Sequence, residues 1–454
     1  MNKITNTANK ALTSSSFSEN DLMNLMEDIL TYGKSIGADG IQSFLAVENG
    51  FNVNIRNSDV ETLEHHQEKG LDITIFHRQQ TGRATTSDFS KAAVRSAIDK
   101  AFAIANYTQP DLFAGLADPE LMAFNYPNLQ LYHPWNITPA EAIEMAIEFE
   151  TVACEQDSRI IHSEGASVST FNSFIIYGNS HQFIGSYSTT IHTISCGLIA
   201  EQNNQKQRDY DYSTNRRPEE LENSILLAKK VAQKTLARLG ARPIKTRKCP
   251  VIFFAPIAKS LLRHFVTAIS GSQIYREESF LLGKLGQPIF PSYIHIHQQP
   301  HLLSALGSAP FDGEGVMTSN IDYVTEGILT QYILSSYSAR KLGLKTTGNA
   351  GGVFNLEVSH SHFNLNDLMH QMDTGLLVTE LLGQGVNITT GNYSRGAAGF
   401  WVEKGEIQFP VEQVTIAANL ADMFLNLVCI ANDVDYRGSV RTGSILVDNM
   451  VIAG

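Results

Sequence analysis

Cysteine is scarce in this 454-residue chain, and the few cysteines follow no binding pattern. The four lie far apart in the sequence and form no C-x-x-C pair: Cys154, Cys196, Cys249 and Cys429. This spacing excludes a disulfide framework and a zinc knuckle built from thiolates. Separate, reduced thiols are typical of a cytoplasmic protein, and we expect that compartment.

An excess of positive charge and a long apolar run are also missing. The formal net charge of −12 argues against a nucleic-acid binder, which needs a basic surface to displace counterions from phosphates. No apolar run approaches the roughly 20 residues that a membrane-spanning helix needs. The polar N-terminal stretch has no apolar core of a secretion signal. We therefore expect no nucleic acid and no membrane among the partners.

The short motifs of several common enzyme classes are absent. The chain contains no G-x-S-x-G nucleophile elbow, no G-x-x-x-x-G-K-[ST] phosphate loop and no G-x-G-x-x-G dinucleotide turn. No pair of carboxylates stands out for acid–base catalysis. These absences exclude the familiar signatures of serine hydrolases, P-loop enzymes and dinucleotide-binding enzymes.

The composition, 43% hydrophobic and 18% charged, is that of a globular protein, and the length favours two domains. In the first half, capping boxes and helical spacing predict helices after Ser18 and Thr138 and a third from about Phe89 to Ala105. A fourth helix is predicted from Pro218 to Gly240. Alternating runs separated by the dipeptides NG, SD and KG predict an antiparallel meander. The order helix, meander, helix occurs twice, so an internal duplication stays open.

The composition of the sequence changes near residue 243, where the basic stretch Arg242–Lys248 predicts a solvated linker. We place an N-terminal α+β domain at residues 1–243 and a C-terminal β-rich domain at 244–454. The second half has frequent glycines and short strands, with helices predicted near Pro256 and Leu365. The expected fold class is α+β, with antiparallel meanders and helices first and a mostly-β domain after them.

Two histidine pairs are spaced for one face of a strand. His295 and His297, like His360 and His362, are two residues apart. Two imidazoles on one face could begin a zinc or iron site. Neither pair has an acidic or cysteine partner nearby in the sequence, and solvated strand histidines are common, so we expect no metal there.

The segment from Pro256 to Ser279, PIAKSLLRHFVTAISGSQIYREES, is the best place to look for a catalytic helix. A helical zinc peptidase needs two nearby histidines and a glutamate that acts as general base on the metal-bound water. This helix offers His264 alone, and Glu277 and Glu278 follow only after a glycine break. A packing helix with a hydrogen-bonded histidine is our first interpretation, and catalysis by these three residues is the alternative.

Glycine is concentrated between Gly375 and Leu420, where a strand–turn–strand pattern surrounds the sequence EKGE. An exposed, glycine-rich sheet edge could bind an extended peptide by strand addition. Arg395 could pair with a carboxylate or a peptide terminus, and a structural ion pair is equally compatible. The candidate peptide-binding residues are Asn392, Tyr393, Ser394, Arg395 and Gly396.

Four stretches together resemble the TldD/PmbA family of bacterial peptidases: DILTYGKSIGADGIQSF, PFDGEGV, LSSYSARKLGLKTTGNAGG and VTELLGQGVNITTGNYSRGAAGFWVEKGEIQFPVEQVTIAANLADM. The match covers nearly the whole chain and is to the PmbA branch, also called TldE. It implies a two-domain subunit that pairs with a TldD-type partner. The pair is expected to be a cytoplasmic metallopeptidase that degrades unfolded peptides and matures some peptide antibiotics and antitoxins.

The resemblance also implies where zinc binds in a TldD-type chain: to two histidines of a His-Glu-x-x-x-His helix and to a cysteine further along. With His264 as the second histidine, the first histidine and the glutamate would fall on Lys259 and Ser260. No cysteine matches in the hairpin region 389–413. Since no zinc ligand carries over, we expect a pseudo-active site without a metal in this chain, and zinc in the partner.

Two alternatives remain open. The chain could be a peptidase in its own right, through His264, Glu277 or Glu278. It could also be a peptide-binding or assembly module without catalysis. Among partners, we expect a heterodimer with the TldD-type subunit, a homodimer when the chain is isolated, and unfolded peptides as substrates.

Overall fold

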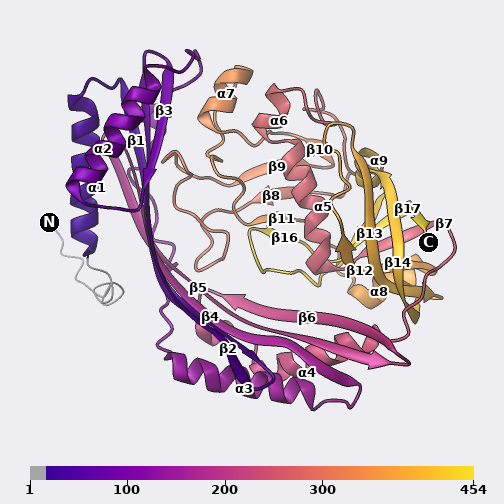
Figure 1. The fold of residues 1–454 in the computed structure, drawn as a ribbon. Helices are drawn as coiled ribbons and strands as arrows, with labels where there is room; N and C mark the ends of the chain where they lie inside the picture. Colours follow the sequence, from indigo (N-terminus) through magenta and orange to yellow (C-terminus); the bar gives the residue numbers. More distant parts are fainter. Residues whose placement is uncertain (1–16) are drawn as a thin grey trace.

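The computed structural model describes residues 17–454, and the first half of the chain forms one antiparallel sheet with the strand order β3-β2-β1-β4-β5-β6. The strands are β1 Gly40–Arg56, β2 Asp59–His77, β3 Gln80–Thr86, β4 Ile160–Asn179, β5 Phe183–Gln202 and β6 Gln205–Asn215. The helices are α1 Glu19–Ser35, α2 Lys91–Ala105, α3 Pro139–Cys154 and α4 Ser224–Ala237. Figure 1 shows these helices on the outer side of the curved sheet, whose inner side faces the second half of the chain.

Two helices and three strands occur twice in this half. The set α1, β1–β3, α2 is followed by the set α3, β4–β6, α4, and β1 pairs with β4 at the centre of the sheet. Each helix pair buries its own apolar cluster against the sheet. The repeated order predicted from the sequence is therefore also a repeated structure, arranged symmetrically about the β1–β4 pair.

Two predicted helix starts are confirmed by capping boxes. The N–H of Asp21 donates to Ser18 Oγ (3.2 Å), and the N–H of Ser18 donates to the Asp21 carboxylate (2.9 Å). Thr138 and Glu141 make the same pair of bonds at the start of α3. Each box satisfies N–H groups that have no partner within the helix.

The helix predicted from Pro218 to Gly240 is shorter at both ends. Pro218–Glu220 forms only a 3-10 turn, and α4 runs from Ser224 to Ala237. Its cap is Asn223, whose side chain accepts the N–H of Leu226 (3.1 Å). An asparagine cap placed after the turn therefore sets the helix start, and the earlier proline does not.

Only one of the three predicted turns in the first meander is a turn. The chain reverses at Asn57 and Ser58, whose φ angles are 54° and 61°, and Glu150 of α3 accepts both N–H groups (2.9 and 2.7 Å). At the NG and KG dipeptides, β1 and β2 continue without a break. Gly50 serves close approach instead, because a Cβ there would lie 2.1 Å from the Thr170 carbonyl oxygen of β4.

The second half builds two sheets, with the orders β10-β9-β8-β11-β16 and β14-β13-β12-β7-β17-β15, and a further β14–β17 pairing closes the latter. The strands are β7 Arg247–Phe253, β8 Ile296–Gln298, β9 Ile321–Thr325, β10 Ile328–Leu329, β11 Leu356–Val358, β12 Gly375–Leu382, β13 Asn392–Glu403, β14 Glu406–Asn419, β15 Leu427–Ile430, β16 Val440–Arg441 and β17 Ile445–Ala453. The helices are α5 Ala255–Ala268, α6 Gly271–Tyr275, α7 Ser336–Leu342, α8 Leu365–Met372 and α9 Leu420–Leu425. The α+β class is confirmed. Within residues 17–454 no helix has the length and apolar character that crossing a membrane requires.

The segment predicted as a solvated linker is exposed along most of its length, but two of its arginines contact the second half. The N–H of Arg242 donates to the Pro410 carbonyl oxygen of β14 (3.2 Å), and its guanidinium lies over the Phe409 ring, 3.8 Å from the centroid. Arg247 begins β7 and lies 4.7 Å from the Trp401 ring centroid. Cation–π contacts therefore hold this basic stretch against β13 and β14. The domain boundary between residues 243 and 244 stays a prediction.

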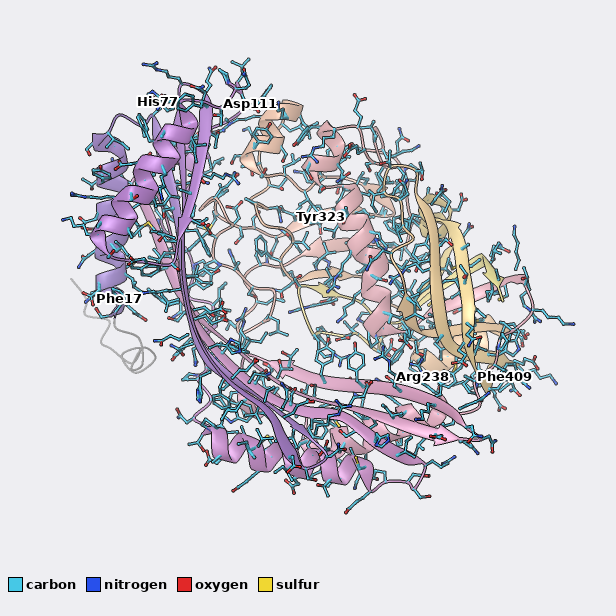
Figure 2. The ribbon with its side chains drawn as sticks, viewed as in Figure 1. Phe17, His77, Asp111, Arg238, Tyr323 and Phe409 are labelled. Atoms are coloured by element: carbon cyan, nitrogen blue, oxygen red, sulfur yellow. The ribbon has the colours of Figure 1, made fainter. Side chains whose placement is uncertain are left out.

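Polar contacts join the two halves at both ends of their interface. At one end, the Tyr337 hydroxyl donates to Asp111 (2.6 Å) and Lys341 pairs with the same carboxylate (3.6 Å). At the other end, Arg238 pairs with Glu380. Figure 2 labels Asp111 and Arg238 and shows how far apart these two ends lie.

A buried carboxylate holds the loop formed by the PFDGEGV stretch. Asp312 is 3% exposed and accepts the N–H groups of Glu314 (2.8 Å), Val316 (3.0 Å) and Ala350 (2.9 Å). Burial, together with the charge of Glu314, raises the pKa of Asp312 to about 7. Since this folded-state pKa lies above the ordinary value of 3.8, folding favours the protonated acid.

The free energy of unfolding should therefore fall as the pH rises from 5 to 8. The contribution of Asp312 is complete below pH 3.8 and is lost as the pH rises through about 7. From pH 5 the loss is at most about 3 kcal/mol, about two pKa units at about 1.4 kcal/mol each. Urea unfolding should show a shallower pH dependence for Asp312→Asn, whereas Asp59→Asn at the exposed start of β2 should leave it unchanged. Equal slopes for Asp312→Asn and the parent chain would contradict this assignment.

Candidate functional site

Helix α5 contains the segment in which the sequence predicts a possible catalytic helix, and its N-terminal end lies next to β6 (Figure 1). Pro256 stands in the first turn, where a missing N–H is tolerated. The N–H of Ala255 donates to Ser444 Oγ (3.0 Å). One face is buried in the large core of the second half: Ala258, Leu261, Leu262 and Phe265. The helix predicted near Pro256 is confirmed.

A buried ion pair occupies the first half of α5. Lys259 is 5% exposed, and its Nζ lies 3.0 Å from Asp435 Oδ2 and donates to the Arg437 carbonyl oxygen (2.9 Å). The guanidinium of Arg437 donates two hydrogen bonds of 2.9 Å to the same carboxylate. Burial lowers the pKa of Lys259 and Asp435 opposes this shift. Burial would raise the pKa of Asp435, but Arg437 and Lys259 outweigh it and hold that pKa below its usual value.

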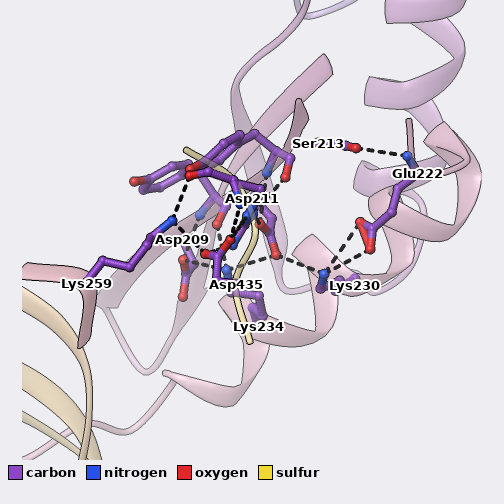
Figure 3. A network of polar contacts seen from close by, with 11 residues as sticks. Asp209, Asp211, Ser213, Glu222, Lys230, Lys234, Lys259 and Asp435 are labelled. Atoms are coloured by element: carbon purple, nitrogen blue, oxygen red, sulfur yellow. Dashed lines mark hydrogen bonds and ion pairs between the residues drawn. The ribbon is translucent and has the colours of Figure 1, made fainter. Parts of the chain in front are cut away.

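The chain of ion pairs continues into the first half of the molecule (Figure 3). Arg437 donates to Asp211 Oδ1 of β6 (2.8 Å), which is 5% exposed. Two lysines of α4 approach the other oxygen of Asp211: Lys234 at 3.3 Å and Lys230 at 3.5 Å. Lys230 also pairs with Glu222 (3.2 Å). The network thus fixes α5 and the loop around residue 435 against β6 and α4.

The same network closes the outer edge of β6 at two positions. Lys234 donates to the carbonyl oxygen of Tyr210 and Arg437 to that of Tyr212, both at 2.8 Å. The N–H groups of the two tyrosines donate to the preceding aspartates (2.8 and 2.9 Å). With these backbone groups taken, a peptide cannot add to β6 as a further strand here.

His264, the histidine of α5, is half-buried. Its Nε2 atom is buried and has no hydrogen-bond partner among the described residues. Its ring lies edge-on to that of Tyr393, with the centroids 6.1 Å apart. Burial, together with the Arg395 guanidinium, lowers the pKa of His264, so the imidazole is neutral at neutral pH. The helix packs as our first interpretation expected, but the expected hydrogen bond is missing at Nε2.

The two other catalytic candidates lie elsewhere. Glu277 and Glu278 follow the short helix α6, and both are exposed. Glu277 has a φ of 60°, which turns the chain there. No hydrogen bond or ion pair links either carboxylate to His264 over residues 17–454. These three residues are therefore not joined by a hydrogen bond or ion pair in the described structure, and their role in catalysis stays a prediction.

The two histidine pairs differ in their surroundings. In the sheet register, His297 lies opposite Asp322 and Glu357, acidic neighbours that the sequence spacing did not reveal. His295, His360 and His362 are exposed. Within the described part of the chain, no three histidine, cysteine or acidic side chains converge in a way that could hold a metal ion.

The glycine-rich hairpin is confirmed, but its peptide-binding edge is not available. β13 lies between β12 and β14, and at its start the N–H of Ser394 donates to the Gly385 carbonyl oxygen (2.7 Å). The predicted strand addition along residues 392–396 is therefore wrong, because the backbone there is already paired on both sides. Glycine allows this packing: a Cβ at Gly385 would lie 1.9 Å from the Ser394 oxygen. A role in peptide binding stays a prediction for the side chains of Asn392, Tyr393, Ser394 and Arg395 and for Gly396.

Three family models match the chain. They describe domain 1 of the PmbA/TldA metallopeptidases at residues 44–105, the central domain at 132–239 and the C-terminal domain at 246–454. Metalloprotease PmbA of Escherichia coli O157:H7 is 44% identical over 94% of this chain and 94% of its own. The chain belongs to the PmbA branch of the PmbA/TldD metallopeptidase family.

Other relatives agree with this placement. The PmbA homolog of Haemophilus influenzae is 44% identical over 89% of this chain and 90% of its own, and the TldD homolog of the same organism is 21% identical over 95% and 92%. A Bacteroides thetaiotaomicron protein, described as a candidate modulator of DNA gyrase, superposes with a TM-score of 0.91 at 25% identity, covering 96% of this chain and 99% of that one. TldE of Thermococcus kodakarensis has the same fold, with a TM-score of 0.81 at 20% identity over 95% and 100%.

The zinc that the PmbA/TldD family implies does not fit the residues of α5. The motif's first histidine falls on Lys259, a cation already held by Asp435 at 3.0 Å. Its glutamate falls on Ser260, whose hydroxyl donates to the Ile257 carbonyl oxygen (2.7 Å). A protonated lysine repels a metal ion and offers it no lone pair. Sequence comparison identified this mismatch, but Asp211, Asp435 and Arg437 gave no local signal.

Removal of the central carboxylate should weaken the fold more than removal of the lysine. Asp435→Asn should lower the free energy of unfolding by about 3–5 kcal/mol, because Lys259 is then buried without a counter-ion. Lys259→Met should cost only about 1–2 kcal/mol, because Arg437 still neutralises Asp435. Lys229→Met on the exposed face of α4 is the matched control in urea unfolding. A smaller loss for Asp435→Asn than for Lys259→Met would refute the proposed order of these contacts.

Proposed function

We propose that this chain is the non-catalytic subunit of a two-chain cytoplasmic metallopeptidase that acts on unfolded peptides. The zinc is held by a TldD-type partner, and this chain contributes structure and substrate contacts to the shared complex. The observation that carries the proposal is the Lys259–Asp435 pair, which stands where a metal-binding histidine would have to be. Relatives named PmbA, TldD and TldE support the pairing of two related chains.

Each requirement of zinc hydrolysis meets an obstacle in α5. A catalytic zinc needs three protein ligands and an open position for water. In α5 only His264 has the chemistry of a ligand, and its neighbour in the same electrostatic environment is the cationic Arg395. The general base would have to be Ser260, and a serine hydroxyl cannot accept a proton from water at neutral pH.

In the proposed complex, this chain supplies a rigid wall for the substrate. The ion-pair network from Lys259 to Lys230 fixes the second half against the first, so the inner side of the curved sheet keeps its shape. A fixed wall holds a flexible peptide at a lower entropic cost than a mobile wall does. On this proposal the isolated chain self-associates through the surface that the partner uses.

The proposal is tested by metal analysis and peptide cleavage with the chain alone and with a TldD-type subunit. The chain alone should hold well below one zinc and cleave no unfolded peptide, whereas the mixture should cleave. Substitution of the zinc-binding histidines of the partner should abolish that cleavage, because the ion lies there. One zinc per isolated chain together with cleavage would overturn the proposal in favour of an autonomous peptidase. Light scattering of the isolated chain checks the self-association.

A further inference from the structure

A cavity of about 380 Å³ lies between β6 and α5, where the two halves of the molecule meet. Four arginines line it. Arg208 and Arg238 belong to the wall of the first half, and Figure 2 shows Arg238 at this junction. Arg263 of α5 and Arg395 of β13 belong to the opposite wall. The two walls differ in how these charges are balanced.

The arginines of the first wall are neutralised by carboxylates. Arg208 pairs with Glu164 (3.6 Å). Arg238 pairs with Asp209 (3.6 Å) and with Glu380. The three carboxylates also line the cavity: Glu164 and Asp209 on this wall, and Glu380 of β12 on the opposite wall.

The arginines of the opposite wall have no counter-ion. Neither Arg263 nor Arg395 forms an ion pair within the part of the chain that the structure describes, and Arg395 Nε is buried without a hydrogen-bond partner. Its neighbours His264, neutral at neutral pH, and the phenol of Tyr393 supply no negative charge. A guanidinium stays charged at any physiological pH, and burial without a partner is unfavourable. Because the Glu380 carboxylate on the same wall is paired with Arg238, these two arginines are suited to an anion from outside the chain.

We infer that this cavity binds the C-terminal carboxylate of a peptide, with Arg395 and Arg263 as the donors. The inference rests on the proposed function, because that function makes peptides the substrate class. A guanidinium presents its N–H groups as a fork that matches the two oxygens of a carboxylate. Lys234 and Arg437 already bind the outward carbonyl groups of β6, so the peptide is held by its terminus and not as an added strand.

The carboxylates of the cavity distinguish a peptide terminus from phosphate. Asp209 and Glu380 can accept the N–H groups of the last peptide residues, but they repel a dianion. Tyr210, 63% exposed, also lines the cavity and offers its ring to a side chain. The volume lies near the lower end of small-ligand sites, so it accommodates only the last residues of the peptide.

The test is fluorescence anisotropy with the full isolated chain, an N-terminally labelled hexapeptide with a free C-terminus, and the same peptide as its C-terminal amide. The acid should bind about tenfold or more tightly than the amide, because the amide loses charge-assisted hydrogen bonds. Arg395→Gln and Arg263→Gln should each weaken the acid about tenfold and leave the amide unchanged. Arg83→Gln, at an exposed position of β3 far from the cavity, is the matched control and should change neither.

Equal binding of acid and amide would overturn the inference, as would displacement of the peptide by inorganic phosphate at lower concentration than by acetate. Arg263 is exposed, so Arg263→Gln keeps the test decisive even where Arg395→Gln disturbs folding. If acid and amide bind alike while the mixture with a TldD-type subunit still cleaves peptides, the carboxylate site fails and the proposed function stands. If the acid binds selectively but the chain never supports cleavage, the proposed function fails and the site stands.

Discussion

The contact between Arg437 and Asp211, 2.8 Å apart, is the constraint on which the junction of the two halves depends. Arg437 satisfies an outward-facing carbonyl of β6 and at the same time holds Asp435, which in turn holds Lys259 of α5. One guanidinium therefore closes a strand edge, orients a loop and fixes a helix. Buried ion pairs contribute little net stability because desolvation offsets their attraction, but each partner strongly disfavours any arrangement that leaves it unpaired. The network accordingly specifies one relative position of the two halves more than it strengthens the fold.

The same constraint explains why α5 is incompatible with zinc. A lysine in place of a histidine removes a ligand and also adds a positive charge that needs a carboxylate. Asp435 supplies that carboxylate from a distant part of the chain, and Arg437 holds it in place. A single substitution of Lys259 by histidine would therefore leave Asp435 and Arg437 arranged around a missing cation, with Ser260 at the position of the motif's glutamate. Several linked changes separate this helix from a metal-binding one.

Local sequence signals predicted most of the helices. The strand order and the contacts of the site depend on pairing between residues far apart in the sequence, which local signals do not show. The capping boxes at Ser18 and Thr138 are contained within four residues, so the sequence shows them completely. The glycine at position 50 resembles a turn residue, but its role is to let β4 approach, and β4 is more than 100 residues away. The prediction of strand addition at residues 392–396 was wrong for the same reason, because the sequence of one segment does not show which strands will lie on either side of it. The site partners Lys259 and Asp435 likewise meet only in the folded chain.

Among residues 17–454, the cationic side chains at the junction of the two halves are of two kinds, those paired with a carboxylate and those without one. Lys259 is buried and paired with a carboxylate, so its positive charge is neutralised within the protein. Arg395 forms no ion pair with a carboxylate among the described residues. The neutral His264 beside it neither neutralises the guanidinium charge nor adds a second positive charge. A guanidinium cannot polarise water as a metal ion does, because it has no empty orbital and does not lower the pKa of bound water to near neutrality. It can still hold an anionic group in a fixed orientation. The charge that remains at this site is therefore suited to positioning an anionic group, and in the proposed function the chemistry comes from the partner chain.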